Sequence, residues 1–150
     1  MTGGLLIRPA EVSDLEQVAA LAHAIFGASA WGLAHFMPHP QREVLLASAG
    51  GEVLGYAVVQ WAGDEAELQS LAVASRRRRA GIGAALLEQA LAFAAGRRAE
   101  TMFLEVRESN LAARGFYGRF GFQECGRRPG YYHEPEEAAL VLRRSVGAGA

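Results

Sequence analysis

The chain lacks lysine, so all 15 of its basic residues are arginine. This absence excludes the nucleotide-binding loop G-x-x-x-x-G-K-[ST], whose lysine contacts the phosphates. The single cysteine, Cys125, excludes an intrachain disulfide and gives no sign of secretion. No apolar run reaches the ~18 residues that a membrane span needs, and the early charges at Arg8 and Glu11 argue against a signal peptide. We therefore expect a cytoplasmic protein that has no membrane partner.

Two further classes find little support in the composition. The formal net charge of −1 argues against nucleic acid as an obligatory partner, because proteins that bind the phosphate backbone usually carry a basic excess. The four histidines show no metal-ligand spacing with one another or with Cys125, so we expect no metal. Cys125 also has no recognisable base that would form a thiolate, which disfavours a covalent intermediate.

The 150 residues, 51% of them hydrophobic, suit a single domain over residues 1–150, with a frayed tail at residues 145–150. Ser13 and Glu16 form a capping box that predicts the start of the first helix, which ends at Gly27. Hydrophobic periodicity predicts further helices at 29–37, 84–94 and 110–120, and strands at 5–8, 44–49, 53–62, 65–73, 101–106, 122–125 and 138–142. The order indicates a mixed α/β layer fold with one clear parallel unit between residues 67 and 106.

The most informative segment lies where the strand 65–73 gives way to the helix 84–94. Four arginines at 76–79 are followed there by Gly81 and Gly83. The first turn of a helix leaves unpaired, partly positive N–H groups that glycines expose to a ligand, so the segment predicts a phosphate or pyrophosphate site. The dinucleotide fingerprint G-x-G-x-x-G does not fit, because Leu86 stands at its third glycine. Residues 78–83 instead resemble the R/Q-x-x-G-x-G/A loop with which GNAT acyltransferases hold coenzyme A. The alternative is an exposed arginine-rich loop before an ordinary helix.

The second half of the chain carries several motifs in order. They are Leu104-Glu105-Val106-Arg107-Glu108-Ser109-Asn110, Phe116-Tyr117, Phe120-Gly121-Phe122, and Arg128 followed by Tyr131-Tyr132. Together they resemble the pattern L-E-V-R-x-S-N … [LF]-Y-x-x-x-G-F … R-x-x-Y-Y of RimI-type N-terminal acetyltransferases within the GNAT superfamily. The resemblance implies the α/β GNAT fold, a mixed and mostly antiparallel sheet flanked by helices. Ser75, where the family often has proline, and Gly115 inside a predicted helix depart from the pattern.

The resemblance also implies a role for each matching residue. Glu105 would be the general base and Tyr117 the general acid, with Glu65 as a second candidate base. The residues implied in binding acetyl-CoA are Leu71, Ala72, Val73, Arg78, Arg79, Ala80, Gly81, Ile82, Gly83, Ala84 and Asn110. The residues implied beside the acceptor amine are Trp31, Glu65, Tyr131 and Tyr132. Residue types alone leave other interpretations open: Glu105 as a solvated strand carboxylate, Tyr117 as a core aromatic, and Asn110 as a helix cap.

The implied activity is N-α-acetyl transfer from acetyl-CoA to a protein N-terminal amine, directly and within a ternary complex. The expected acceptor is the N-terminal alanine of a small-subunit ribosomal protein. One alternative is a GNAT acetyltransferase for a small-molecule or lysine amine. Another is a non-catalytic acyl-CoA-binding module, although a pure binder has no use for an acid and a base. The sequence does not indicate an oligomeric state.

Overall fold

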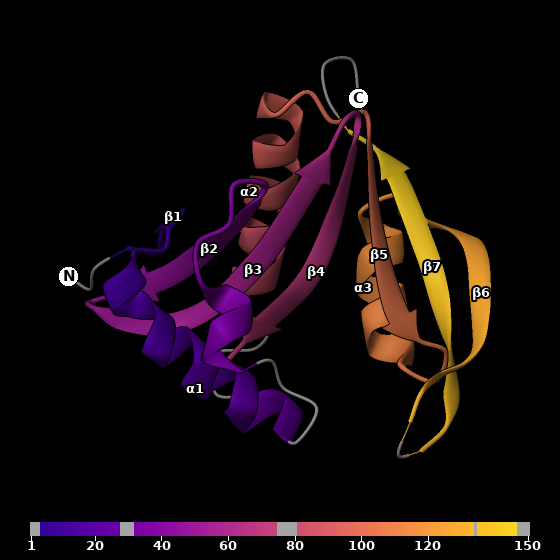
Figure 1. Cartoon of the computed structure of the whole chain (residues 1–150), viewed down its shortest axis with the longest axis horizontal. Helices are drawn as coiled ribbons and strands as arrows, with labels where there is room; N and C mark the ends of the chain where they lie inside the picture. Colours follow the sequence, from indigo (N-terminus) through magenta and orange to yellow (C-terminus); the bar gives the residue numbers. More distant parts are fainter. Residues whose placement is uncertain (1–3, 28–31, 75–80, 134, 147–150) are drawn as a thin grey trace.

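The computed structural model describes residues 4–27, 32–74, 81–133 and 135–146. One seven-stranded sheet runs through the molecule in the order β1-β2-β3-β4-β5-β7-β6 (Figure 1). The strands are β1 (Leu6–Pro9), β2 (Arg42–Ala49), β3 (Glu52–Ala62), β4 (Glu65–Val73), β5 (Thr101–Arg107), β6 (Gln123–Tyr132) and β7 (Glu137–Ser145). The helices are α1 (Leu15–Phe26), α2 (Ile82–Gly96) and α3 (Leu111–Arg119), with the 3₁₀ turns η1 (Val12–Asp14) and η3 (Leu33–Phe36). Every strand pair is antiparallel except β4 with β5, so the mixed α/β sheet predicted from the sequence is confirmed.

A hydrophobic core lies on each face of the sheet, because β2 and β3 bury apolar side chains on both of their sides. On one face, α2 buries Leu86 and Leu87 against the sheet, and aromatic residues of α3 extend the same cluster. On the other face, α1 and η3 bury Leu15, Val18 and Phe36. In Figure 1, α1 lies over β2 to β4, while β5, β7 and β6 lie to its side. Among the described residues, therefore, no helix covers the β5-β7-β6 part of this second face.

The strands β4 and β5 pair over a short distance and then separate. Their parallel pairing is limited to residues 65–67 of β4 and 101–103 of β5, and Figure 1 shows the two strands diverging beyond this point. A β-bulge contributes to the bend of β4: Val58 of β3 pairs with Ser70 and Val59 pairs with Leu68, which leaves Gln69 as the extra residue. A bulge bends its strand and increases the local twist, so β4 turns away from β5.

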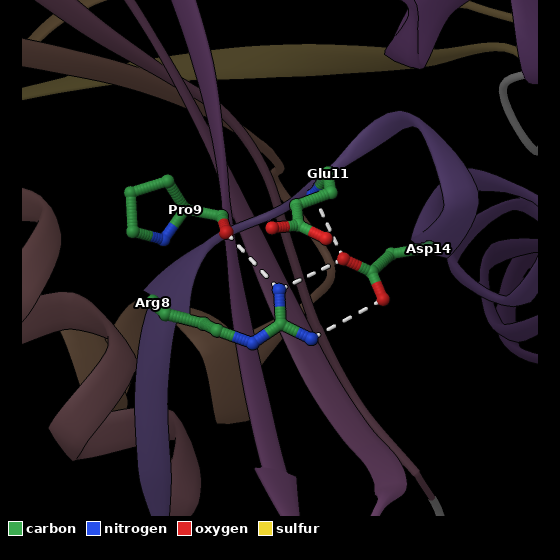
Figure 2. Close-up of polar contacts among 4 residues, drawn as sticks. All are labelled: Arg8, Pro9, Glu11 and Asp14. Atoms are coloured by element: carbon green, nitrogen blue, oxygen red, sulfur yellow. Dashed lines mark hydrogen bonds and ion pairs between the residues drawn. The ribbon is translucent and has the colours of Figure 1, made fainter.

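Arg8 joins the first strand to the first helix. Its guanidinium binds the carboxylate of Asp14 through two hydrogen bonds of 2.8 and 3.2 Å, and it also donates to the backbone oxygen of Pro9 (Figure 2). The capping box at this helix start uses Glu11 and Asp14, with the Glu11 N–H donating to Asp14 at 2.7 Å. The prediction of a box at Ser13 and Glu16 is therefore wrong. The physical reason is that Arg8 is available to hold Asp14 in place, a contact that local spacing does not contain.

Two other sequence-based boundaries differ from the structure. The helix predicted at 29–37 is the short turn Leu33–Phe36, preceded by residues 28–31, which lie outside the described residues. The frayed tail predicted at residues 145–150 does not include its first two residues, because Ser145 pairs with Thr101 and Val146 is buried and donates to the backbone oxygen of Glu100. Residues 147–150 lie outside the described part of the chain.

Candidate active site

A cleft of about 720 Å³ lies where β4 and β5 diverge. Its walls come from α1, β4, β5, α3 and the hairpin between β6 and β7. Several residues singled out in the sequence line this central cleft, namely Leu71, Glu105, Asn110, Tyr117, Tyr131 and Tyr132. The fold therefore brings together residues from four elements, among them both members of the predicted acid–base pair.

Glu105 stands in the middle of β5, whose alternation buries Leu104 and Val106 in the core and directs Glu105 to the opposite, uncovered face. Only 18% of its side chain is exposed, and Nη1 of Arg128 lies 3.2 Å from its Oε2. The Glu105 carboxylate also interacts with the Tyr131 hydroxyl and raises the pKa of Tyr131 above its usual value. Two β6 side chains therefore hold Glu105, which is not a freely solvated strand residue.

Tyr117 belongs to the core and to the cleft at once. Its ring packs against Phe116 at 5.2 Å and Phe122 at 5.7 Å between centroids. Burial raises the pKa of its phenol to about 12, so the hydroxyl stays protonated throughout the physiological range. Its hydroxyl has no hydrogen-bond partner in the described part of the chain, and the residue lines the central cleft.

Asn110 caps α3, as the simpler interpretation of this residue predicts. Its side-chain oxygen accepts a hydrogen bond of 3.1 Å from the Ala113 N–H. The preceding loop is fixed by Glu137, which accepts from the Ser109 N–H and pairs with Arg107 at 3.3 Å. Asn110 also lines the central cleft. Its cap role and a role in binding a ligand are compatible, because a side-chain amide has donors as well as an acceptor.

The start of α2 leaves backbone donors free where the sequence predicts an anion site. Gly81 is the N-cap with φ 79°, a left-handed conformation that favours glycine. The N–H of Ala85 is the first to close the helix by donating to Gly81, so the N–H groups of residues 82–84 have no partner within the helix. A side chain at Gly83 would meet Phe116 of α3 at 3.6 Å, which places the two helices close together here. The other predicted residues of this loop, Arg78, Arg79 and Ala80, lie outside the described residues.

The end of β4 presents a free backbone edge toward the cleft. Leu71, Ala72 and Val73 pair with β3 on one side. On the other side the pairing with β5 stops at Glu67, so in the described chain no strand occupies that edge. An extended ligand could bind such an edge as an added strand would. This arrangement fits the backbone role that the resemblance implies for these three residues.

Glu65 lies apart from the other predicted site residues. It is exposed at the start of β4 and does not line the central cleft. It lines a second hollow of about 410 Å³ on the uncovered sheet face, hereafter the side groove, together with Glu67, Glu105 and Arg128. Glu105 lines both hollows. Trp31, the remaining candidate beside the acceptor amine, lies outside the described residues.

Sequence reasoning missed Glu67 and Arg128, which flank the candidate base. Glu67 pairs with Phe103, two residues before Glu105 on the same face of the sheet. Its carboxylate accepts a hydrogen bond of 3.3 Å from Nε2 of Gln69, the bulged residue. The alternation of β4 and β5 could have placed Glu67 near Glu105, whereas the approach of Arg128 depends on the β6–β7 pairing, which no local signal in the sequence specifies.

Two features are absent from the described residues. No group of three or more histidine, cysteine, aspartate or glutamate side chains gathers in a way that could hold a metal ion. No helix in this part of the chain is long and apolar enough to cross a membrane.

A mixed sheet that opens between two parallel strands, with a helix N-terminus at the end of the first, is the architecture of an N-acetyltransferase. The chain belongs to the acetyltransferase (GNAT) family, whose model matches residues 14–122, and it is an acetyl-CoA-dependent N-acetyltransferase. It is similar to the N-alpha-acetyltransferase RimI of Mycobacterium tuberculosis, being 33% identical over 90% of this chain and 89% of that one.

Solved structures agree with this assignment. The crystal structure of the ribosomal-protein-S18-alanine N-acetyltransferase from Escherichia coli is similar over 98% of this chain and 97% of that one, with a TM-score of 0.85 and 28% identity. A protein from Bacillus anthracis solved in complex with acetyl coenzyme A shares the fold, with a TM-score of 0.80 and 19% identity over 95% of this chain and 99% of that one. The GNAT fold and the resemblance to RimI-type enzymes, both predicted from the sequence, are confirmed.

Proposed function

We propose that this enzyme acetylates the N-terminal α-amine of a protein in the cytoplasm, and that its acceptor is the N-terminal alanine of a small-subunit ribosomal protein. The observation that carries the proposal is that Glu105 and Tyr117 line the same cleft, one as a carboxylate and the other as a neutral phenol. The protein acceptor is supported by the relatives, two of which are named an N-alpha-acetyltransferase and a ribosomal-protein-S18-alanine N-acetyltransferase.

The donor would occupy the backbone side of the cleft. Acetyl-CoA would place its pyrophosphate on the N–H groups from residue 79 to residue 84, where the start of α2 offers unpaired donors and the helix dipole favours an anion. Its pantetheine arm would lie along the free edge of Leu71, Ala72 and Val73, with Asn110 beside it. This placement puts the thioester next to Tyr117, because the residue lines the cleft into which that edge faces.

The chemistry requires a neutral amine, a polarised carbonyl and a stabilised thiolate. Glu105 would take a proton from the acceptor, directly or through a water, and the neutral amine would attack the thioester carbon. Tyr117 would then give its proton to the sulfur as the carbon–sulfur bond breaks, so that CoA leaves as a thiol. A phenol with a pKa of about 12 is a weak acid, but the thiolate forms in the same water-poor space, where burial raises its affinity for a proton as well.

An α-amine suits this site better than a lysine. An N-terminal amine has a pKa near 8, so roughly a third of it is neutral at pH 7.5, against ~0.1% of lysine with a pKa of about 10.4. A single carboxylate is therefore sufficient to deprotonate an α-amine. The rings of Tyr131 and Tyr132 lie 5.1 Å apart at the end of β6. They would close over the first residues of an extended peptide.

The test uses one alanine-first peptide in two forms. The first form has a free N-terminus and a blocked lysine, and the second has a blocked N-terminus and a free lysine. Mass spectrometry should find acetyl on the first form only, and Glu105→Gln should lower that rate by ~10²–10⁴-fold with little change in acetyl-CoA affinity. Preferential labelling of the second form would refute the N-terminal acceptor. A panel that varies the first two residues then tests whether the ribosomal-protein sequence is preferred.

A further inference from the structure

A cluster of charged side chains lies where the side groove meets the central cleft. Glu105 is paired with Arg128 at 3.2 Å, and Glu67 lines the side groove with both of them. All three charges also act on the same hydroxyl: Glu105 and Glu67 raise the pKa of Tyr131 and Arg128 lowers it. The cluster therefore contains two carboxylates and one guanidinium, and one negative charge is left without a partner.

The neighbouring charged groups do not supply the missing positive charge. Arg107, which also faces the central cleft, is paired with Glu137 at 3.3 Å. Glu65, two residues before Glu67 on β4, also lines the side groove, but it is exposed, so solvent screens its charge and we do not count it in the cluster. Gln69 donates a neutral hydrogen bond of 3.3 Å to Glu67, which orients this carboxylate without neutralising it.

The geometry holds the two carboxylates in place more firmly than the guanidinium. Glu105 stands on a central strand with 18% of its side chain exposed, whereas 59% of the Arg128 side chain is exposed on the edge strand β6. The pairing of β6 with β7 becomes irregular directly after Arg128. The guanidinium also lies 5.4 Å from the centre of the Tyr131 ring, so its other contact is a side chain of the same edge strand.

We propose that Glu67 and Arg128 set the charge of the acceptor site: together with Glu105 they leave one uncompensated negative charge, which a single protonated amine neutralises when the acceptor binds. The inference rests on the proposed function, in which Glu105 receives the acceptor's proton. Glu67 and Arg128 are positioning residues, because they act on the acceptor through this shared charge. Arg128 weakens binding of the ammonium form of the acceptor, so that the ammonium can still lose its proton to Glu105. Glu67 supplies the negative charge that attracts the ammonium.

The proposal predicts opposite shifts for two charge-changing variants. At saturating acetyl-CoA, Arg128→Met should lower the KM for a free-amine peptide about tenfold and also lower kcat, because the ammonium form is held too well. Glu67→Gln should raise that KM about tenfold, a change that corresponds to about 1.4 kcal/mol. The double variant restores one uncompensated negative charge, and its KM should return to within about threefold of the wild-type value. These shifts should shrink at high salt, as interactions between partly exposed charges do.

Arg127→Met is the matched control. Arg127 is the preceding residue on β6, half of its side chain is exposed, and it pairs with Glu108 at 3.1 Å. Arg127 lines neither hollow, so its loss removes the same charge without changing the cluster. Its KM should stay within about twofold of wild type. Arg128→Lys keeps the positive charge and should keep the wild-type KM. Binding of the peptide to the CoA-loaded protein, measured by calorimetry, separates affinity from turnover.

Two results would overturn the charge inference. A higher KM for Arg128→Met would make Arg128 a direct ligand of the peptide and overturn the inference. Equal losses of kcat in Arg128→Met and Glu67→Gln at unchanged KM would also overturn it. Such losses would mean that the two residues only orient Glu105. If the wild-type enzyme acetylates a lysine or a small amine and no N-terminus, the proposed function fails. The two KM shifts measured with that amine then decide the charge inference independently.

Discussion

Removal of the Tyr117 hydroxyl should separate catalysis from stability. Phenylalanine at this position keeps the ring contacts with Phe116 and Phe122, which lie at 5.2 and 5.7 Å. The lost hydroxyl has no hydrogen-bond partner in the part of the chain that the structure describes, and Tyr117 lines the central cleft, so its removal breaks no hydrogen bond there. Tyr117→Phe should therefore be as stable as wild type or more stable. The rate of acetyl transfer should fall ~10²–10⁴-fold, or about 3–5 kcal/mol of activation free energy.

The assay combines single-turnover acetyl transfer with urea denaturation at pH 7.5. Tyr56→Phe is the matched control, because Tyr56 also lines the central cleft but shares a hydrogen bond of 2.9 Å with the Ser70 hydroxyl. This control should lose about 1 kcal/mol of stability and less than tenfold in rate. A normal single-turnover rate in Tyr117→Phe would refute the acid role. Destabilisation by more than about 1 kcal/mol would show that the hydroxyl has a partner.

The raised pKa of Tyr117 adds a pH dependence with a definite sign. The pKa is about 12 in the native protein against 10.0 for an ordinary tyrosine, so the unfolded chain loses this proton first. Ionisation of this group therefore leaves the stability unchanged below pH 10 and lowers it as the pH rises toward about 12. The loss amounts to about 3 kcal/mol, and Tyr117→Phe should remove it from the alkaline denaturation profile. An unchanged profile above pH 10 would contradict the burial of the phenol.

Three further predictions concern the scaffold of the site. Gly55→Ala should lower the free energy of unfolding by about 1–3 kcal/mol in urea, because the new Cβ would lie 2.7 Å from the backbone oxygen of Ala72, and acetyl-CoA affinity should fall with it. Asn110→Ala should remove the cap of α3, costing about 1 kcal/mol, with Asn110→Asp keeping the cap and isolating any loss of coenzyme binding. Asp14→Asn should destabilise at pH 7 by about 1 kcal/mol through loss of the capping contact. Hydrogen bonding from Arg8 lowers the pKa of Asp14, so this difference should shrink as the pH falls below about 4, and a difference that persists at pH 2 would refute the assignment.

The sequence predicted the elements that depend on local patterns. The strand predicted at residues 65–73 agrees with β4 (Glu65–Val73), because the turn at Gly63-Asp64 marks its start. The strand at 101–106 and the helix after Gly81 also appear within two residues of their expected bounds. The placement of Glu105 and Tyr117 in one cleft followed from the family resemblance, since their distance in sequence alone says nothing about their distance in space.

The features that the sequence did not reveal depend on pairing between distant segments. The bulge at Gln69 exists only in the register of β4 against β3. The sequence of one strand alone does not specify its register with the partner strand. Arg128 reaches Glu105 because β7 lies between β5 and β6, an order that follows from the whole topology. Likewise, Glu65 looked like a second base from its position on β4, but the strand pairing places it at the start of the side groove and brings Glu67 nearer to Glu105.

The opening between β4 and β5 supplies both halves of the site from one structural feature. Lost ladder hydrogen bonds would destabilise the sheet if either strand stood alone, because unpaired backbone groups are costly when buried. Each strand is instead supported from its outer side: β3 pairs along β4 through the bulge, and β7 pairs with all of β5 from Thr101 to Arg107. The inner edges are thereby left free without loss of the fold. Under the proposed function, the β4 edge would offer backbone groups to the donor, and β5 would present Glu105 to the acceptor on the uncovered face. The two substrates would then meet at the point where the strands separate.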